Sequence, residues 1–260
     1  MDSSATLIDC AIVENDGAYG GGVYCAGSAT LINCLIAGNS ASNGGGVCGS
    51  ASLINCVVAG NRAVNEGGGL YGARLTDGIV TGNTADYGGG AWCDDESALV
   101  NCVVTGNVAI NAGGVACYGG GLLSGSLIAG NSAWTGGGVR SDDGAPTITS
   151  CTVAGNDALR AACLLSFDAV ISARSCVLWA DGGSALDIAS GTASVTYSDV
   201  QSGWGGAGNI DADPLFVGGG SGTWTSNGIY DPQNHLVTLT DSAAAWSPVR
   251  RPHIRRATSA

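Results

Sequence analysis

An asparagine, preceded by glycine in most of its copies, returns along this chain at a nearly constant interval. The steps between successive copies are 24, 22, 22, 24, 24 and 25 residues. Self-similarity at this period indicates a solenoid or an array, in which each unit buries its apolar face by stacking on its neighbours. The copies are Asn15, Asn39, Asn61, Asn83, Asn107, Asn131 and Asn156, and a degenerate eighth unit has Asp181 at this position.

Three further columns keep the same register and hold apolar or small residues, so we expect them to face inward. Three residues before the asparagine stand Ile12, Ile36, Val58, Val80, Val104, Ile128, Val153 and Leu178. Eight residues before it stand Leu7, Leu31, Leu53, Leu75, Leu99, Leu123, Ile148 and Ala173. Five residues before it stand Cys10, Cys34, Cys56, Gly78, Cys102, Ser126, Cys151 and Cys176.

The apolar runs in each unit are short and rich in β-branched residues, which favours strands over helices. The 45 glycines also disfavour long helices. Leucine-rich repeats have a similar period but need several leucines per unit, whereas these units have one or two. We therefore predict an all-β fold, a parallel β-helix (solenoid) of about eight to nine rungs with a short C-terminal extension. Its rungs would lie about 4.8 Å apart.

Polar residues are expected at the bends of this coil. Glycine permits a positive φ where the chain turns. Asparagine tolerates left-handed backbone and can hydrogen-bond to the asparagines of the rungs above and below. The repeated asparagine predicts one such ladder. A second column predicts another: Asp9, Asn33, Asn55, Asp77 and Asn101.

Two short motifs recur in the units: Gly-Gly followed by an aliphatic residue, as in Gly45-Gly46-Val47, and an aliphatic-x-x-Asn motif, as in Ile12-x-x-Asn15. They resemble the Gly-Gly-Ala-[Ile/Val] and Phe-x-x-Asn motifs of polymorphic outer-membrane proteins and related bacterial surface β-helices of the pectate-lyase-like superfamily. Ile or Val replaces the phenylalanine throughout. Residues 197–217 look like the segment that closes many such β-helices. The resemblance covers about residues 5–217.

The resemblance implies right-handed coiling, export, and a place outside the cell or on its outer surface. No basic-then-apolar leader follows Met1, and no apolar run is long enough to span a membrane. Export therefore rests on the resemblance. Because the repeat is under way by residue 7, we interpret the chain as an internal piece of a longer one.

The charge distribution argues against nucleic acid as a partner. The formal net charge is −12, and Arg250, Arg251, Arg255 and Arg256 stand in the last eleven residues. Without them the rest carries five arginines against 21 acids, a formal charge of −16. Such a body repels nucleic acid and anionic lipid. We divide the chain into a β-helix with its closing segment (1–217), a linker with a hairpin-like pair of strands (218–248), and a basic tail (249–260) expected to be disordered.

The eleven cysteines are expected to act mainly as small core residues. Their spacing by whole rungs differs from the paired spacing of zinc sites, and no histidine lies in the repeats. A Ser-His-Asp or Cys-His pair within the repeats is therefore excluded. Some disulfides would be expected if the protein is exported.

One column after the glycines is expected to face outward, which makes its residues candidates for glycan binding. Alternation along the strand turns Tyr24, Tyr71, Trp92 and Arg140 away from the core. Aromatic rings can stack on sugar rings, and arginine can hold a uronate carboxylate. Cys48 and Ala116 complete this column.

Two acidic clusters give a second set of candidate residues. Asp94-Asp95 and Asp142-Asp143 follow the glycine bend two rungs apart. They are candidate calcium ligands, and calcium is the one cofactor left open. Arg140, Asp142 and Asp143 are candidate catalytic residues for a pectate-lyase-like site, with Arg140 as base. A solvated acidic loop is the simpler interpretation of these clusters, and the sequence favours it.

These observations favour a non-enzymatic, secreted or cell-surface scaffold, adhesin-like, whose partner would be a polysaccharide or a host or cell-surface glycan. The alternative function is a polysaccharide lyase or hydrolase acting on acidic glycans. The sequence leaves the oligomeric state open.

Overall fold

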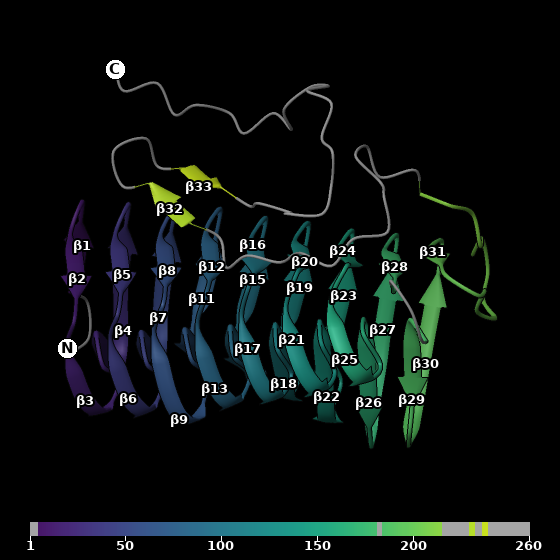
Figure 1. Ribbon diagram of the computed structural model, residues 1–260, viewed down its shortest axis with the longest axis horizontal. Helices are drawn as coiled ribbons and strands as arrows, with labels where there is room; N and C mark the ends of the chain where they lie inside the picture. The colour runs from purple at the N-terminus through teal and green to yellow at the C-terminus, as the bar shows by residue number, and fades with distance from the viewer. Residues whose placement is uncertain (1–4, 181–183, 215–228, 232–235, 239–260) are drawn as a thin grey trace.

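The computed structural model describes residues 5–180, 184–214, 229–231 and 236–238. Within them the chain is all-β and forms a parallel β-solenoid of about eight turns (Figure 1). The predicted fold class is thus confirmed, while the right-handed coiling stays a prediction. Asp181 and the basic tail 249–260 lie outside the described residues.

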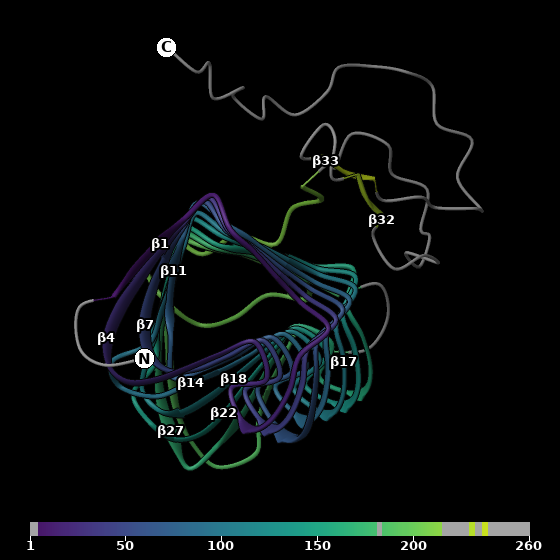
Figure 2. The ribbon, with the colours of Figure 1, turned by 90° about the vertical axis from the view of Figure 1, so that its left-hand side faces the viewer.

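Each rung contributes strands to three parallel sheets, which Figure 2 shows end-on as the walls of the coil. Sheet B contains the aliphatic column that stands three residues before the repeated asparagine. Its strands are β2 (Ala11–Val13), β5 (Leu35–Ala37), β8 (Val57–Ala59), β12 (Ile79–Thr81), β16 (Val103–Thr105), β20 (Leu127–Ala129), β24 (Thr152–Ala154), β28 (Val177–Trp179) and β31 (Asp199–Val200).

Sheet C follows the repeated asparagine. Its strands are β3 (Asp16–Tyr19), β6 (Ser40–Asn43), β9 (Arg62–Glu66), β13 (Thr84–Tyr87), β17 (Val108–Asn111), β21 (Ser132–Thr135) and β25 (Asp157–Arg160).

Sheet A follows the glycine bend and has two limbs, which run together as one long strand in some rungs. Its strands are β1 (Thr6–Ile8), β4 (Val23–Ile32), β7 (Val47–Ile54), β10 (Leu70–Tyr71), β11 (Arg74–Thr76), β14 (Ala91–Cys93), β15 (Ala98–Val100), β18 (Val115–Gly119), β19 (Leu122–Ser124), β22 (Val139–Gly144), β23 (Thr147–Thr149), β26 (Leu164–Phe167), β27 (Ala169–Arg174), β29 (Leu186–Ile188) and β30 (Gly191–Thr196). Beyond the solenoid, β32 (Ile229–Asp231) pairs antiparallel with β33 (Leu236–Thr238).

The aliphatic columns predicted from the sequence form the core. Leu31, Leu53, Leu75 and Leu99 pair rung by rung in sheet A, and each is at most 1% exposed. Ile36, Val58 and Val80 do the same in sheet B. Burial falls off at the N-terminal end, where Leu7, Cys10 and Ile12 are partly exposed because no described rung covers them.

The repeated asparagine forms a buried ladder, as predicted. The Oδ1 atom of Asn83 accepts hydrogen bonds from the backbone N–H of Asn61 at 2.9 Å and from its Nδ2 at 3.0 Å. The Nδ2 of Asn83 donates in turn to Asn107 Oδ1 at 2.9 Å and to the Val58 carbonyl at 3.0 Å. All four hydrogen-bonding positions of the amide are therefore used. The same pattern runs from Asn15 to Asn156.

The second polar column also forms a ladder, on the surface. Asn33 donates to Asp9, Asn55 to Asn33, and Asn101 to Asp77. These residues adopt φ between 51° and 55°. In the buried ladder, by contrast, the left-handed residue is the glycine before the asparagine, as at Gly60 and Gly82. Left-handed tolerance of asparagine thus explains the exposed ladder, whereas the buried one depends on its hydrogen bonds.

The glycine bend brings backbones of adjacent rungs into close contact. A Cβ at Gly46 would lie 2.6 Å from the carbonyl oxygen of Gly69 and 3.1 Å from the Nδ2 of Asn61. A side chain at this position would therefore push apart both the bend and the asparagine ladder beside it.

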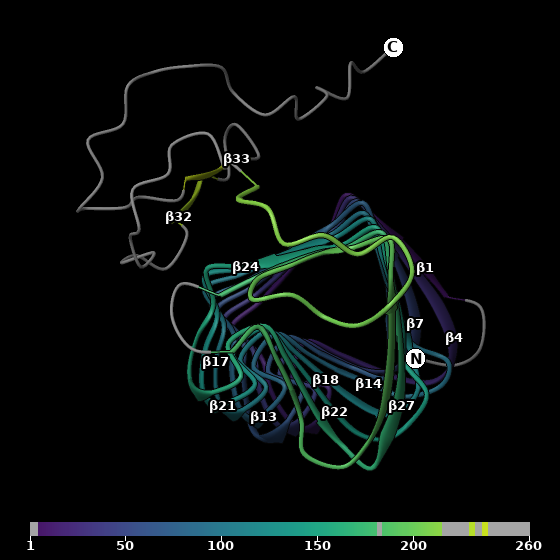
Figure 3. The same ribbon diagram turned by 90° about the vertical axis from the view of Figure 1, so that its right-hand side faces the viewer.

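A closing segment covers the far end of the solenoid, where the green chain after β31 crosses the coil in Figure 3. Asn209 accepts a hydrogen bond from the backbone N–H of Ser198 at 3.0 Å and donates to the Val195 carbonyl at 2.8 Å. Trp204 packs against the core. Since Ser198 Oγ itself accepts from the N–H of Cys176, Asn209 takes the place that the next rung would occupy.

We predict that Asn83→Ala destabilises the fold by about 4 kcal/mol, because four buried hydrogen bonds are lost and their backbone partners stay buried. Asn65→Ala is the matched control: it removes one exposed amide hydrogen bond to Asn43, and we expect a change below about 0.5 kcal/mol. Urea denaturation measures both. Equal losses of stability in the two variants would contradict the stabilising role of the buried asparagine ladder.

Candidate functional site

Two columns of outward residues contact each other across the glycine bends that join sheet C to sheet A. The bend column, on sheet A, is the registered series Tyr24, Cys48, Tyr71, Trp92, Ala116 and Arg140. The facing column, on sheet C, is Tyr19, Asn43, Glu66, Tyr87, Asn111, Thr135 and Arg160. The four predicted glycan-binding residues therefore lie in one column.

Exposure varies strongly along the bend column. Tyr24 is 50% exposed and lies beside Tyr19, which is 59% exposed, with ring centroids 6.4 Å apart and a tilt of 45°. Tyr71 and Trp92 are half-buried, and Cys48 and Ala116 are buried. Large neighbours from both columns cover Cys48 and Ala116. The bend column, which alternation along the strand predicted to face outward, is therefore exposed to solvent mainly at Tyr24.

Tyr71 and Trp92 stack on each other. Their ring centroids are 4.4 Å apart and their planes 7° from parallel, and Trp92 also stacks on Tyr118 at 6.1 Å. A sugar ring needs an open aromatic face, and these rings turn faces toward each other along the solenoid axis. Burial and the nearby Glu66 raise the pKa of the Tyr71 hydroxyl. These two rings thus stabilise neighbouring rungs and leave little face for a ligand.

Arg140 is held on all sides by the protein. Its Nε and Nη2 donate to both oxygens of Asp142, at 2.7 and 3.0 Å, and its Nη1 donates to Asn111 and Thr135. The guanidinium also lies over the rings of Tyr87 and Phe167, at 5.2 and 4.7 Å from their centroids. The structure brings Arg140 and Asp142 together on one strand, β22, and the contacts of Arg140 with Asn111, Tyr87 and Phe167 tie this rung to others.

The acidic clusters do not converge on one point. Asp94 and Asp142 lie in the same line two rungs apart, with Tyr118 between them. Asp94 caps its own turn by accepting from Ser97 and from the Glu96 N–H, while Asp95 and Asp143 are exposed. Since Arg140 occupies both oxygens of Asp142, these groups do not fit calcium, which needs six to eight converging oxygens. The described residues contain no cluster of three metal-binding side chains.

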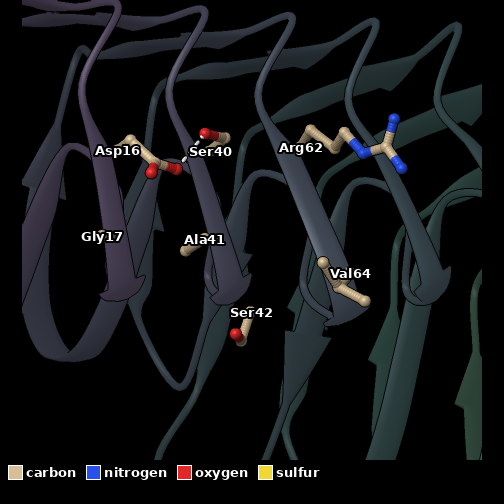
Figure 4. A pocket seen from close by; sticks show the side chains of 7 residues that line it. All are labelled: Asp16, Gly17, Ser40, Ala41, Ser42, Arg62 and Val64. Carbon is tan, nitrogen blue, oxygen red and sulfur yellow. Dashed lines mark hydrogen bonds between the residues drawn. The ribbon is translucent and has the colours of Figure 1, made fainter.

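A shallow trough lies on the outer face of sheet C, in the rungs nearest the N-terminus (Figure 4). Its floor is the small residues Ser40, Ala41 and Ser42 of β6, and its volume is about 410 Å³. Asp16 on β3 forms one wall, and Arg62 and Val64 on β9 form the other. Since strands lie about 4.8 Å apart, the walls stand roughly 10 Å from each other.

The charged groups of this trough differ in how they are held. Asp16 accepts a hydrogen bond from the Ser40 hydroxyl. No described residue accepts a hydrogen bond from the Arg62 guanidinium, which extends from an exposed position. Sequence reasoning missed these residues because sheet C was read as the third strand of a scaffold. The available signal was the run of small residues at 40–42 between Asp16 and Arg62.

All eleven cysteines are free thiols, and ten are buried. Cys56 donates to the carbonyls of Ile54 and Leu31, at 3.3 and 3.4 Å. Burial raises the pKa of the Cys56, Cys102 and Cys151 thiols to about 11. The predicted role as small core residues is confirmed, with hydrogen bonds to backbone carbonyls added.

The chain matches no protein-family model and no curated protein. None of the described residues belongs to a helix that could cross a membrane.

We predict that Arg140→Lys destabilises the protein by about 2–3 kcal/mol, because lysine cannot reproduce the paired hydrogen bonds and stacking of the guanidinium. Arg62→Lys is the control, because the Arg62 guanidinium donates to none of the described residues, and it should change stability by less than about 0.5 kcal/mol. Thermal or urea unfolding compares the two. Equal stability of both variants would show that the cross-rung tie is unimportant.

The raised thiol pKa values predict a loss of stability at high pH. Unfolded thiols ionise near pH 8.5, whereas folded Cys56, Cys102 and Cys151 hold their protons to about pH 11. The unfolded state therefore releases protons first, and the free energy of unfolding falls between those values by a few kcal/mol. Urea denaturation under reducing conditions at pH 7 to 10.5 measures it.

The double variant Cys56→Ser/Cys102→Ser is the control. Serine already stands in this column at Ser126, where its hydroxyl donates to the Leu99 and Ser124 carbonyls. The variant should show a flatter pH dependence than the parent protein. An unchanged slope would mean that other groups cause the loss.

Proposed function

We propose that this protein is a non-enzymatic, adhesin-like β-solenoid, secreted or displayed on the cell surface, that binds a uronate-containing glycan in the trough on sheet C. The observation that carries the proposal is the trough itself, which is lined both by Arg62, whose guanidinium donates to no described residue, and by the hydrogen-bonded pair Asp16 and Ser40. Export, surface location and right-handed coiling come from the likeness to bacterial surface β-helices in the repeat motifs.

The chemistry of the trough suits a sugar that carries both a carboxylate and hydroxyls. Arg62 can donate two parallel hydrogen bonds to a carboxylate. The carboxylate of Asp16 and the hydroxyl of Ser42 supply partners for sugar hydroxyls. Val64, 56% exposed, offers an apolar wall for a ring face. Roughly 10 Å between the walls accommodates one extended chain.

The exposed pair Tyr19 and Tyr24 extends this surface. Tyr19 ends the strand that carries Asp16, and Tyr19 and Tyr24 are both at least half exposed. A glycan longer than the trough can stack there. Tyr24 thus keeps the role proposed from the sequence, while the stacked Tyr71 and Trp92 and the occupied Arg140 contribute by stiffening the neighbouring rungs.

The net charge of −12 opposes long-range attraction of a polyanion. Binding is therefore expected to be weak and of short range, with avidity from several copies on a surface raising the effective strength. Weak binding that avidity strengthens suits a scaffold displayed in several copies on a surface.

We predict that oligogalacturonate binds the protein and that Arg62→Ala weakens binding about tenfold, because a charge-assisted pair is lost. Arg74→Ala is the matched control: Arg74 is exposed on the outer face of sheet A, outside the trough. Calorimetric titration measures both. Equal affinity of the parent and the Arg62 variant would refute the site.

The same samples test the competing enzymatic function. Incubation with polygalacturonate and calcium should release no unsaturated sugars, which absorb in the ultraviolet. Their release would show that the protein is a polysaccharide lyase and that the scaffold proposal is wrong.

A further inference from the structure

A ridge of large apolar side chains lies on the outer face of sheet C, beyond the rungs that form the trough. Strands β17, β21 and β25 lie side by side there (Figure 1). Their register places Ile110, Trp134 and Leu159 next to one another on successive rungs, and these three residues are here called the apolar ridge. Their side chains are 50%, 69% and 87% exposed. Contiguous exposed apolar residues, in contrast to scattered ones, indicate a binding surface.

The indole ring of Trp134 is held differently from the other tryptophan of the glycine bends. Trp92 stacks on both Tyr71 and Tyr118 and is half-buried. Within the described part of the chain, by contrast, no aromatic ring or guanidinium stacks on Trp134. Its neighbours in the apolar ridge are aliphatic. Trp134 is therefore the aromatic side chain of sheet C that is best placed to stack on a ligand.

Polar side chains flank the apolar ridge on the same face. Ser132 and Asp157 lie in the neighbouring outward column, each two residues before a member of the ridge on its own strand. Asp86 on β13 precedes Ile110 in the column of the ridge itself. None of the described residues forms a hydrogen bond with the side chains of these three residues. The ridge thus has hydrogen-bonding groups at its border and none along its length.

The charges around the apolar ridge exclude an anionic ligand. The one basic residue in strands β13, β17, β21 and β25 is Arg160, whose Nε atom is paired with Asp187 at 2.5 Å. Asp86 and Asp157 therefore leave the ridge with negative charge and no available cation, which repels a carboxylate. The trough differs in this respect because it contains Arg62. The ligand of the ridge is expected to be neutral.

The size of the apolar ridge excludes a second protein molecule as its main partner. Three strands at about 4.8 Å and two outward columns give an area of roughly 150 Å². A standard protein–protein interface buries about 800 Å² on each partner. The ridge has instead the dimensions of a sugar ring, which has an apolar C–H face and hydroxyls around its edge.

We propose that the apolar ridge binds a neutral sugar ring, which stacks on Trp134 and donates hydroxyl hydrogen bonds to Asp157 and Ser132. The inference rests on the proposed function, because it treats the ridge and the trough as two sites for one glycan. Arg62 on β9 and Trp134 on β21 lie on the same face three strands apart, about 14 Å. A glycan that lies along the solenoid axis reaches both. The partner is therefore a heteropolysaccharide that contains uronate and neutral sugars.

Calorimetric titration of the full chain with cellohexaose, a neutral glucose oligomer with equatorial hydroxyls, tests the ridge. Trp134→Ala should weaken binding about tenfold, whereas Trp134→Phe should stay within about threefold of the parent because it keeps an aromatic face. Cellohexaose should also change the tryptophan fluorescence of the parent. That change should be lost in Trp134→Phe while the heat of binding remains, a result that a purely structural role of Trp134 would not give.

Two further variants form a matched pair of aliphatic truncations. Leu159→Ala shortens a member of the apolar ridge and should weaken cellohexaose binding about threefold. Val170→Ala shortens a residue of β27 in sheet A that is 59% exposed, and it should leave the affinity unchanged. All of these positions are exposed, so the variants should unfold in urea at the same midpoint as the parent.

The two glycan sites can fail separately. Arg62→Ala should leave the affinity for cellohexaose unchanged, and Trp134→Ala should leave the affinity for oligogalacturonate within about twofold of the parent. Binding of cellohexaose without binding of oligogalacturonate would refute the trough and support the ridge. The proposal for the ridge is overturned if the parent does not bind cellohexaose, or if Trp134→Ala binds it as tightly as the parent. A dimer of the parent in sedimentation that Trp134→Ala dissociates would also overturn it, since a second copy would then occupy the ridge.

Discussion

The hydrogen-bonded asparagine ladder is the constraint on which the rest of the structure depends. Each buried amide accepts two hydrogen bonds from the rung before it and donates one to the rung after it, and its second donor satisfies a backbone carbonyl. A buried amide with an unsatisfied position would cost more than a single hydrogen bond contributes. Adjacent rungs are therefore locked in one register, and the glycine bends, the aliphatic columns and the outward faces inherit that register.

Because the register is constant, side chains on the surface meet mainly others of the same column. This explains why Tyr71 stacks on Trp92 and why Arg140 donates to Asn111 on the neighbouring rung. In such a fold, a binding site forms where the residue type changes from one rung to the next along a column. The trough of sheet C is such a break: small residues on β6 lie between Asp16 and Arg62. The outer face of sheet B from β2 to β28 is the opposite case, because neither of its two outward columns holds a charged residue there.

Much of the fold could be predicted from the sequence, since the columns of Asn39, Ile36 and Leu31 are visible as a period. The candidate site was harder to predict. Alternation along a strand correctly placed Tyr24, Tyr71, Trp92 and Arg140 in one column, yet it could not show that the glycine bend turns the facing column of sheet C over it. Nor could it show which way the rings lie, because ring orientation depends on the neighbouring rung. The trough was missed since its walls, Asp16 and Arg62, belong to units 46 residues apart.

The sequence by itself determined the architecture: a repeat of aliphatic, glycine and asparagine positions allows few folds other than a stacked parallel coil, since each rung must satisfy its buried amide and cover its apolar face on a neighbour. The tertiary structure alone decided which outward side chains are free. The folded coil closes the faces of Tyr71 and Trp92 and pairs the guanidinium of Arg140 with Asp142, whereas no residue in the described part of the chain accepts a hydrogen bond from Arg62. The register of the rungs follows from a pattern that each repeat contains. Whether a side chain is free to bind a ligand depends on its neighbours on other rungs, which only the folded structure shows.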